Sequence, residues 1–158
     1  KGSPIRDYRQ LSGKKVGVGS GSTANIKGLQ KAIDNKLIDP PCDMVLFEDH
    51  SKGFLGLQQG KVDAYFTDEA MLAGMRAKAQ KPEEWEIAGA FLTYEPYGFI
   101  LPKDDSKWRD FVNATLIKLY KDGSFEKIYN KWFGPGSQLV LPMTEEYKIM
   151  LKVLSLPD

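Results

Sequence analysis

Short runs rich in β-branched and aromatic residues alternate with helix-like segments through the first hundred positions of the chain. Such runs predict strands, and apolar residues at i, i+3 and i+7 spacing predict amphipathic helices. The predicted strands are residues 15–19, 43–48, 62–67, 86–89 and 97–101. The helix after the first strand places Ile26, Leu29 and Ile33 on one face, and further helices are expected at residues 50–60 and 69–79.

The pattern becomes helical from Pro102 onward. We expect helices at residues 104–121, 125–133 and 144–154, with Thr144 as the cap of the last one. Aromatic residues recur through the first two of these helices at helical spacing, which favours packing over base stacking.

The resulting order is β-α-β-α-β-α-β-β followed by helices. This alternation predicts an α/β fold with a mostly parallel sheet and helices on its faces. Ligands of such sheets bind beyond the carboxyl ends of the strands. Three polar clusters are expected there: Ser20–Thr23, His50 and Thr67–Asp68.

The first cluster, SGST, has the chemistry to hold a carboxylate. Glycine lets the backbone turn sharply, and the helix that follows directs its positive end into the same space. The hydroxyls of Ser22 and Thr23 would donate to the ligand, although an ordinary capped helix start explains the same string. The G-x-G-x-x-G spacing of dinucleotide sites and the Gly-Lys-Ser/Thr of phosphate loops are absent from the sequence.

The other two clusters supply a carboxylate and an imidazole. Asp68 can bind an ammonium group or cap the helix that follows, and its position alone favours the cap. His50 is the single histidine, and its place on the same rim favours a polar-ligand contact. A Ser-His-Asp triad is disfavoured because neither Ser20 nor Ser22 stands in a G-x-S-x-G nucleophile elbow. We therefore expect no catalytic residue.

The composition argues against nucleic acid and a zinc ion as partners of this chain. The 22 basic and 21 acidic residues give no basic stripe for nucleic acid, and one cysteine with one histidine excludes a Cys/His zinc site within a single chain. We expect no metal and no cofactor. No apolar run approaches the ~18–20 residues that cross a bilayer. Residues 1–4 are not followed by an apolar stretch, so the protein is either cytoplasmic or its signal peptide has been removed.

Four segments, in order and at the right spacing, resemble family-3 periplasmic solute-binding proteins from the opening of their second lobe to their terminal helix, and the fold of that family is the type II periplasmic-binding-protein fold. They are LSGKKVGVGSGST, GLQQGKVDAYFTDEAMLAG, EPYGFILPKDD and YKDGSFEKIYNKWFG, and together they cover about residues 10–134. The segments FEDHSKGF, RAKAQKPEEWEIAG and PMTEEYKIML are similar to the glutamate/aspartate-binding branch.

The resemblance implies a role for each rim residue. Ser22 and Thr23 would hold a carboxylate of the ligand, and Ser22 replaces the commoner threonine while keeping the hydroxyl. Asp68 would hold the α-ammonium group, His50 would contact an acidic carboxylate, and Ser20 would support the loop.

The resemblance also implies a domain organisation and partners. Residues 1–98 would be the second lobe, and residues 99–158 would be a returning hinge strand and C-terminal helices that pack on a first lobe. That first lobe would supply an arginine for the α-carboxylate, and it has no counterpart in this sequence. The implied protein is the periplasmic substrate-binding component of an amino-acid ABC transporter, which delivers glutamate or aspartate to a membrane permease.

Two other functions on the same fold stay open: a ligand-sensing module of a receptor and a dehydratase-type enzyme. Glu69, beside Asp68, is the acid that an enzyme would use, but it falls in the first turn of a helix, so we expect no enzyme. In the chain alone, we expect the apolar faces of helices 104–133 and 144–154 to be buried by each other or by a partner chain, as in a dimer or a domain swap.

Overall fold

The computed structural model describes residues 2–90, 92–93 and 97–155, without the side chains of residues 23–26. It divides into two compact units, Lys1–Pro96 (unit 1) and Tyr97–Asp158 (unit 2). The expected assignment of residues 1–98 and 99–158 to two lobes of a longer protein stays a prediction.

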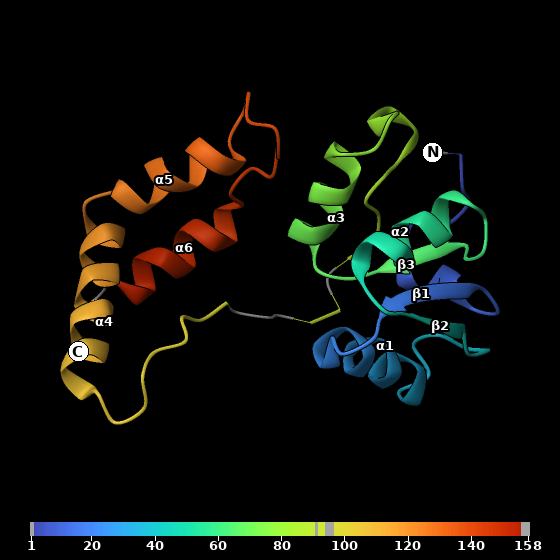
Figure 1. Ribbon diagram of the computed structural model, residues 1–158, viewed down its shortest axis with the longest axis horizontal. Helices are drawn as coiled ribbons and strands as arrows, with labels where there is room; N and C mark the ends of the chain where they lie inside the picture. Colours follow the sequence, from blue (N-terminus) through green and yellow to red (C-terminus); the bar gives the residue numbers. More distant parts are fainter. Residues whose placement is uncertain (1, 91, 94–96, 156–158) are drawn as a thin grey trace. The chain divides into compact units, whose positions relative to one another are not determined.

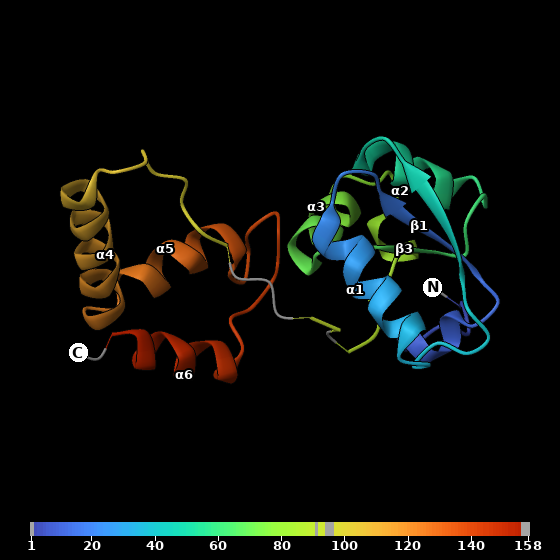
Figure 2. The same cartoon turned by 90° about the horizontal axis from the view of Figure 1, so that it is seen from below.

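Unit 1 contains a three-stranded parallel sheet with helices on both faces, as Figure 1 and Figure 2 show. Its elements are η1 (Tyr8–Leu11), β1 (Lys15–Gly19), α1 (Thr23–Asp34), β2 (Asp43–Phe47), α2 (His50–Gln58), β3 (Ala64–Phe66), α3 (Glu69–Ala77) and η2 (Pro82–Glu84). The sheet order is β2-β1-β3, so β1 is central. Gly19 pairs with Phe47, and Val18 pairs with Phe66. The parallel sheet and its three following helices are as predicted.

The two faces of β1 are filled in different ways. Val16 and Val18 are fully buried and belong to a core that includes Leu29 of α1. The residues between and after them, Gly17 and Gly19, have no side chain on the opposite face, which α2 covers (Figure 1). A Cβ at Gly17 would lie 2.8 Å from the Tyr65 ring of β3, so a ring from a flanking strand occupies that space.

Helix α2 contributes its own glycines to this layer. Gly53 and Gly56 are buried and lie three residues apart, on one side of the helix. A Cβ at Gly56 would lie 2.5 Å from the Phe47 ring, and one at Gly53 would overlap the Tyr65 ring. Glycines on both sides therefore let α2 approach the sheet closely, with Phe47 and Tyr65 packed between them.

Unit 2 consists of α4 (Ser106–Lys121), α5 (Ser124–Phe133) and α6 (Glu145–Leu154), and α4 contacts both other helices. The side chain of Thr144 accepts a hydrogen bond from the Tyr147 amide at 3.2 Å, which confirms it as the cap of α6. Asp105 caps α4 by accepting from the Trp108 amide at 2.9 Å, so this helix begins two residues later than predicted. Across the described residues of both units, none of the helices combines the length and apolar character of a membrane span.

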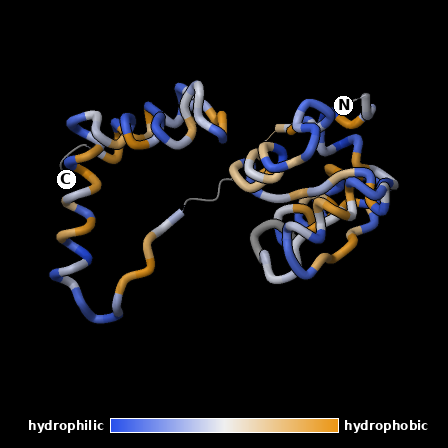
Figure 3. The backbone as a smooth tube through the Cα atoms, turned by 45° about the horizontal axis from the view of Figure 1, so that its top comes forward, coloured by the Kyte–Doolittle hydropathy of each residue, from blue (hydrophilic) through white to orange (hydrophobic). Residues whose placement is uncertain are grey.

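Two predicted strands are not strands in the structure. Residues 86–89 and 97–101 pair with no strand among the described residues. The apolar composition that predicted the second one is visible in Figure 3, but Ile100 is 101% exposed and Phe99 is 70% exposed. A strand needs a neighbour for its backbone hydrogen bonds, and alternation alone does not supply one. In the first segment, Gly89 has a φ of 101°, which is outside the strand region.

The expectation that the helices of unit 2 bury one another holds only in part. Several large apolar side chains on the helices of this unit are exposed, among them Phe111 at 60%, Trp132 at 62% and Val153 at 60%. The Tyr129 ring of α5 also contacts the Tyr147 ring of α6, but the contacts among the three helices leave these apolar side chains uncovered. Burial of these faces by another chain stays a prediction.

Candidate ligand-binding site

The carboxyl ends of the three parallel strands define one edge of the sheet in unit 1. β1 ends at Gly19, β2 at Phe47 and β3 at Phe66, and the register places these ends side by side. Every residue predicted to contact ligand follows one of these ends. The predicted clusters are therefore brought to one rim, as a parallel sheet requires.

At the end of β1, the chain turns directly into α1. Ser20 is exposed, and its amide donates to the Phe47 carbonyl at 2.6 Å, which ties this turn to the end of β2. Gly21 has a φ of 85°, a conformation that glycine adopts without strain. Ser22 is half-buried at the N-cap position of α1, but its side chain makes no capping hydrogen bond. Thr23 begins α1, and its side chain lies outside the described residues.

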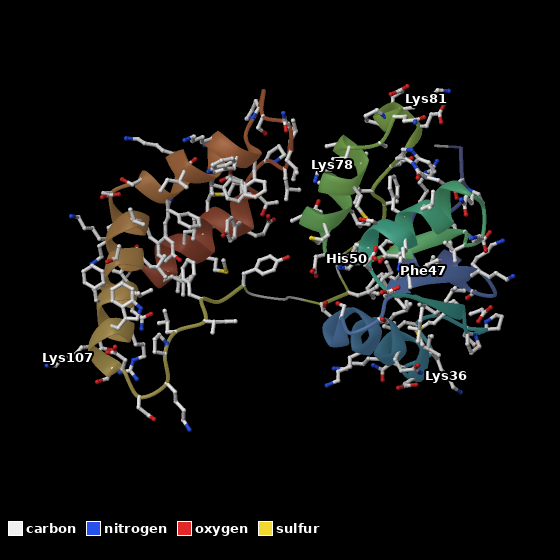
Figure 4. The ribbon with its side chains drawn as sticks, in the orientation of Figure 1. Lys36, Phe47, His50, Lys78, Lys81 and Lys107 are labelled. Carbon is white, nitrogen blue, oxygen red and sulfur yellow. The ribbon has the colours of Figure 1, made fainter. Side chains whose placement is uncertain are left out.

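At the end of β2, Asp49 is the N-cap of α2, with its carboxylate accepting from the Lys52 amide at 2.8 Å. His50 is thus the first residue of the helix, and Figure 4 labels it together with Phe47, the last residue of β2. The His50 ring is half-buried and lies over β1: a Cβ at Gly19 would be 3.1 Å from its Cε1 atom. The structure therefore brings His50 directly against the end of the central strand.

At the end of β3, Asp68 occupies the N-cap position of α3, and its carbonyl accepts from the Leu72 amide at 3.0 Å. Its carboxylate makes no side-chain capping bond to α3, so the prediction of Asp68 as the cap is right for the position and wrong for the side-chain bond. The half-buried Asp68 follows Thr67, which is 8% exposed. The rim thus carries a half-buried carboxylate at the start of α3.

Tyr65 belongs to the rim and was missed by the sequence analysis. Its hydroxyl lies 2.9 Å from Nδ1 of His50, and the two rings meet edge to face at 6.1 Å between centroids. Burial, with a further contribution from Asp49, raises the pKa of Tyr65 to about 12. The hydroxyl therefore keeps its proton at neutral pH. The signal in the sequence was the set of glycines at positions 17, 19, 53 and 56, which leave room for a ring.

The rim has the chemistry to form hydrogen bonds to a small polar ligand. It combines hydroxyls, an imidazole and a carboxylate, and the first turn of α1 directs backbone amides to the same edge. In the described part of the chain, no group of three or more Cys, His, Asp or Glu side chains is placed to hold a metal ion. A separate pocket of about 570 Å³ between α2 and α3, lined by residues such as Phe54 and Met75, contains none of the predicted contacts.

Comparison with known proteins gives this fold and rim a family. The sequence model of the family "Bacterial extracellular solute-binding proteins, family 3" matches residues 15–135, which include all three strand ends. The chain belongs to this family.

Individual relatives are similar over most of the chain. The glutamate/aspartate import solute-binding protein of Escherichia coli is 36% identical over 133 residues, which are 84% of this chain and 43% of that protein. The L-glutamate/L-aspartate-binding protein of Pseudomonas aeruginosa is 33% identical over 158 residues, 96% of this chain and 51% of that protein. The solved structure of an ancestral arginine-binding protein bound to arginine is 33% identical with a TM-score of 0.66, covering 85% of this chain and 56% of that one. The chain thus spans about half the length of the curated relatives it matches, and its type II periplasmic-binding-protein-like lobe is established.

Proposed function

We propose that this chain forms part of the periplasmic substrate-binding component of an amino-acid ABC transporter, with glutamate or aspartate as the ligand. The observation that carries the proposal is the gathering of Ser22, His50 and Asp68 at the carboxyl ends of three adjacent parallel strands. Two relatives that are named for binding glutamate and aspartate support the choice of ligand. The partner of the complete protein would be the membrane permease of its transporter.

Each rim residue has a role that follows from its chemistry. Asp68 would bind the α-ammonium group of the ligand through charge-assisted hydrogen bonds. The hydroxyls of Ser22 and Thr23 would donate to a ligand carboxylate near the first turn of α1, where the helix dipole also favours negative charge. His50 would donate to the second carboxylate, and Ser20 would hold the turn through its bond to β2.

The ligand would bind between two lobes and leave chemically unchanged. Closure of two lobes about a hinge is how such a site encloses its ligand. The rim in unit 1 is one side of that site, so the chain alone would bind its amino acid weakly or not at all. An enzyme would need an acid at the reacting atoms, and Glu69, the nearest sequence candidate, lies in the first turn of α3.

Calorimetric titration of the complete protein that contains this chain tests the proposal. We expect L-glutamate or L-aspartate to bind and to be recovered unchanged. Binding of arginine or glutamine alone would refute the acidic ligand, and recovery of a converted product would refute a purely binding role.

The variant Asp68→Asn tests the ammonium contact. Removing the charge at constant size should weaken binding about 10- to 100-fold, because hydrogen bonds to charged groups are worth about 1.5–3 kcal/mol. The matched control is Asp43→Asn, at the opposite end of β2, where binding should not change. Equal affinities for Asp68→Asn and the unmodified protein would remove Asp68 from the site.

A further inference from the structure

The Tyr65 ring is held by glycines on two elements. A Cβ at Gly17 would lie 2.8 Å from its Cδ2 atom, a Cβ at Gly19 would lie 3.5 Å from its hydroxyl, and a Cβ at Gly53 would overlap the ring. Tyr65 is only 8% exposed. With backbone on both sides, the ring has one position, and so its hydroxyl has one position too.

That hydroxyl lies at hydrogen-bond distance from His50. The Tyr65 oxygen and Nδ1 of His50 are 2.9 Å apart, within the usual range for a hydrogen bond. The imidazole edge that carries Nδ1 and Cε1 lies over Gly19. A Cβ at Gly19 would be 3.4 Å from Nδ1. One contact orients the ring from β3, and the other supports it from β1.

The chemistry of the pair assigns the donor. Which nitrogen of a neutral histidine carries the proton is set by the hydrogen bond that the other nitrogen makes. A phenol is a good donor and a neutral imidazole nitrogen a good acceptor, so the Tyr65 hydroxyl donates and Nδ1 accepts. Because burial raises the pKa of Tyr65, the phenol has its proton available to donate at neutral pH.

We infer that Tyr65 is a positioning residue of the ligand site, which orients the His50 ring and places its proton on Nε2. Nε2 then carries a proton in both charge states of the ring, because the imidazolium is protonated on both nitrogens. His50 therefore always offers a donor, which is what a ligand carboxylate requires. This inference rests on the proposed function for the nature of the ligand, but the state of the ring does not depend on it.

The proton position is measurable in the chain itself, without ligand. His50 is the single histidine, so ¹⁵N-histidine labelling gives one imidazole signal set whose two nitrogen shifts report the tautomer. In the unmodified chain we expect neutral His50 to have a protonated Nε2 and an unprotonated Nδ1. The opposite tautomer, or an even mixture, would overturn the inference without any variant.

The variant Tyr65→Phe removes the hydroxyl and leaves the ring between the glycines. We expect the His50 nitrogen shifts to move toward a mixture of tautomers. Tyr8→Phe, which removes a hydroxyl elsewhere in unit 1, should leave those shifts unchanged. A merely structural role for Tyr65 would be satisfied by phenylalanine, so unchanged shifts in Tyr65→Phe would also overturn the inference.

The role in binding is then read in the complete protein with L-glutamate as the probe. Tyr65→Phe should weaken binding about 3- to 10-fold, the usual size of one neutral hydrogen bond. A tautomer change with unaltered affinity would overturn the part of Tyr65 in ligand binding. If the unmodified protein does not bind L-glutamate or L-aspartate, the proposed function fails, whereas the tautomer result still decides the position of the proton.

Discussion

Units 1 and 2 both contain amphipathic elements, but they bury their apolar side chains to different extents. In unit 1 the side chains of Val16, Val18 and Leu29 are fully buried at 0% exposure. Among the described residues of unit 2, the most buried hydrophobic side chains are Leu151 at 8% and Met143 at 9%. A sheet covered on both faces closes a core by itself, whereas three helices in partial contact do not.

The difference bears on where the function can reside. The rim lies in the unit with the closed core, so its side chains stand on elements that the packing holds in place. Unit 2 exposes the large apolar side chains of Trp108, Phe111 and Trp132 and buries few hydrophobic side chains. We therefore expect unit 1 to carry the greater local stability.

The sharpest way to break this comparison is to make the same substitution in both units. Leu29→Ala opens a cavity at a fully buried position and should lower the free energy of unfolding by about 2–5 kcal/mol. Leu154→Ala, at a position in α6 that is 50% exposed, should cost about 1 kcal/mol or less. Hydrogen-exchange mass spectrometry measures both effects, with peptides from each unit read separately. Equal costs would contradict a closed core confined to unit 1.

A smaller effect is expected at the layer between α2 and the sheet. Gly53→Ala forces a methyl group into the Tyr65 ring and should destabilise unit 1 by about 1–3 kcal/mol. Gly28→Ala in α1 is the matched control. Its methyl group would lie 3.2 Å from the Thr93 side chain, and the gain in helix propensity offsets that contact. Denaturant unfolding followed by circular dichroism measures both variants. If Gly53→Ala were as mild as the control, the close approach of α2 would be wrong.

The smallest effect is a dependence of stability on alkaline pH, which comes from one tyrosine in each unit. Burial raises the pKa of Tyr65 in unit 1 to about 12 and raises that of Tyr120 in unit 2 as well. The folded state then holds the Tyr65 proton more tightly than the unfolded chain does. The contribution of Tyr65 to the free energy of unfolding is therefore fully present below pH 10 and is lost as the pH rises from 10 to about 12.

Tyrosinate absorbance measures this dependence, as differences between the unmodified chain and the variants Tyr65→Phe and Tyr120→Phe. The Tyr65 difference should have its midpoint near pH 12, and alkaline loss of stability should be shallower in Tyr65→Phe. A Tyr65 midpoint at its ordinary value of 10.0 would show that the ring is not enclosed by α2.

The sequence was sufficient for the central fold and for most of the rim. Residues 15–19 form a strand as predicted, and the other two strands end at residues 47 and 66, one residue before the predicted ends at 48 and 67. Because parallel strands end at the same edge, this order alone brings Ser22, His50 and Asp68 to one rim. The contribution of the Thr23 side chain and the ligand roles of all five predicted residues stay predictions.

The sequence was insufficient where a distant element decides the outcome. Residues 97–101 have the composition of a strand, but a strand also needs a neighbour, and composition does not supply one. The sequence predicts a strand at Tyr65 but not its contact with His50, because that contact depends on how closely α2 approaches the sheet. That distance is set by Gly53 and Gly17, which are far apart in the sequence.

The two glycines of α2 also determine when the rim can form. Each interior glycine costs an isolated helix about 1 kcal/mol relative to alanine, and α2 is only nine residues long, so it is a poor helix before it docks. Docking in turn needs the Phe47 and Tyr65 rings, which are in place only after β2 and β3 have paired with β1. His50 would therefore acquire its position late in folding, and local opening of α2 in the native state would remove it from the rim first.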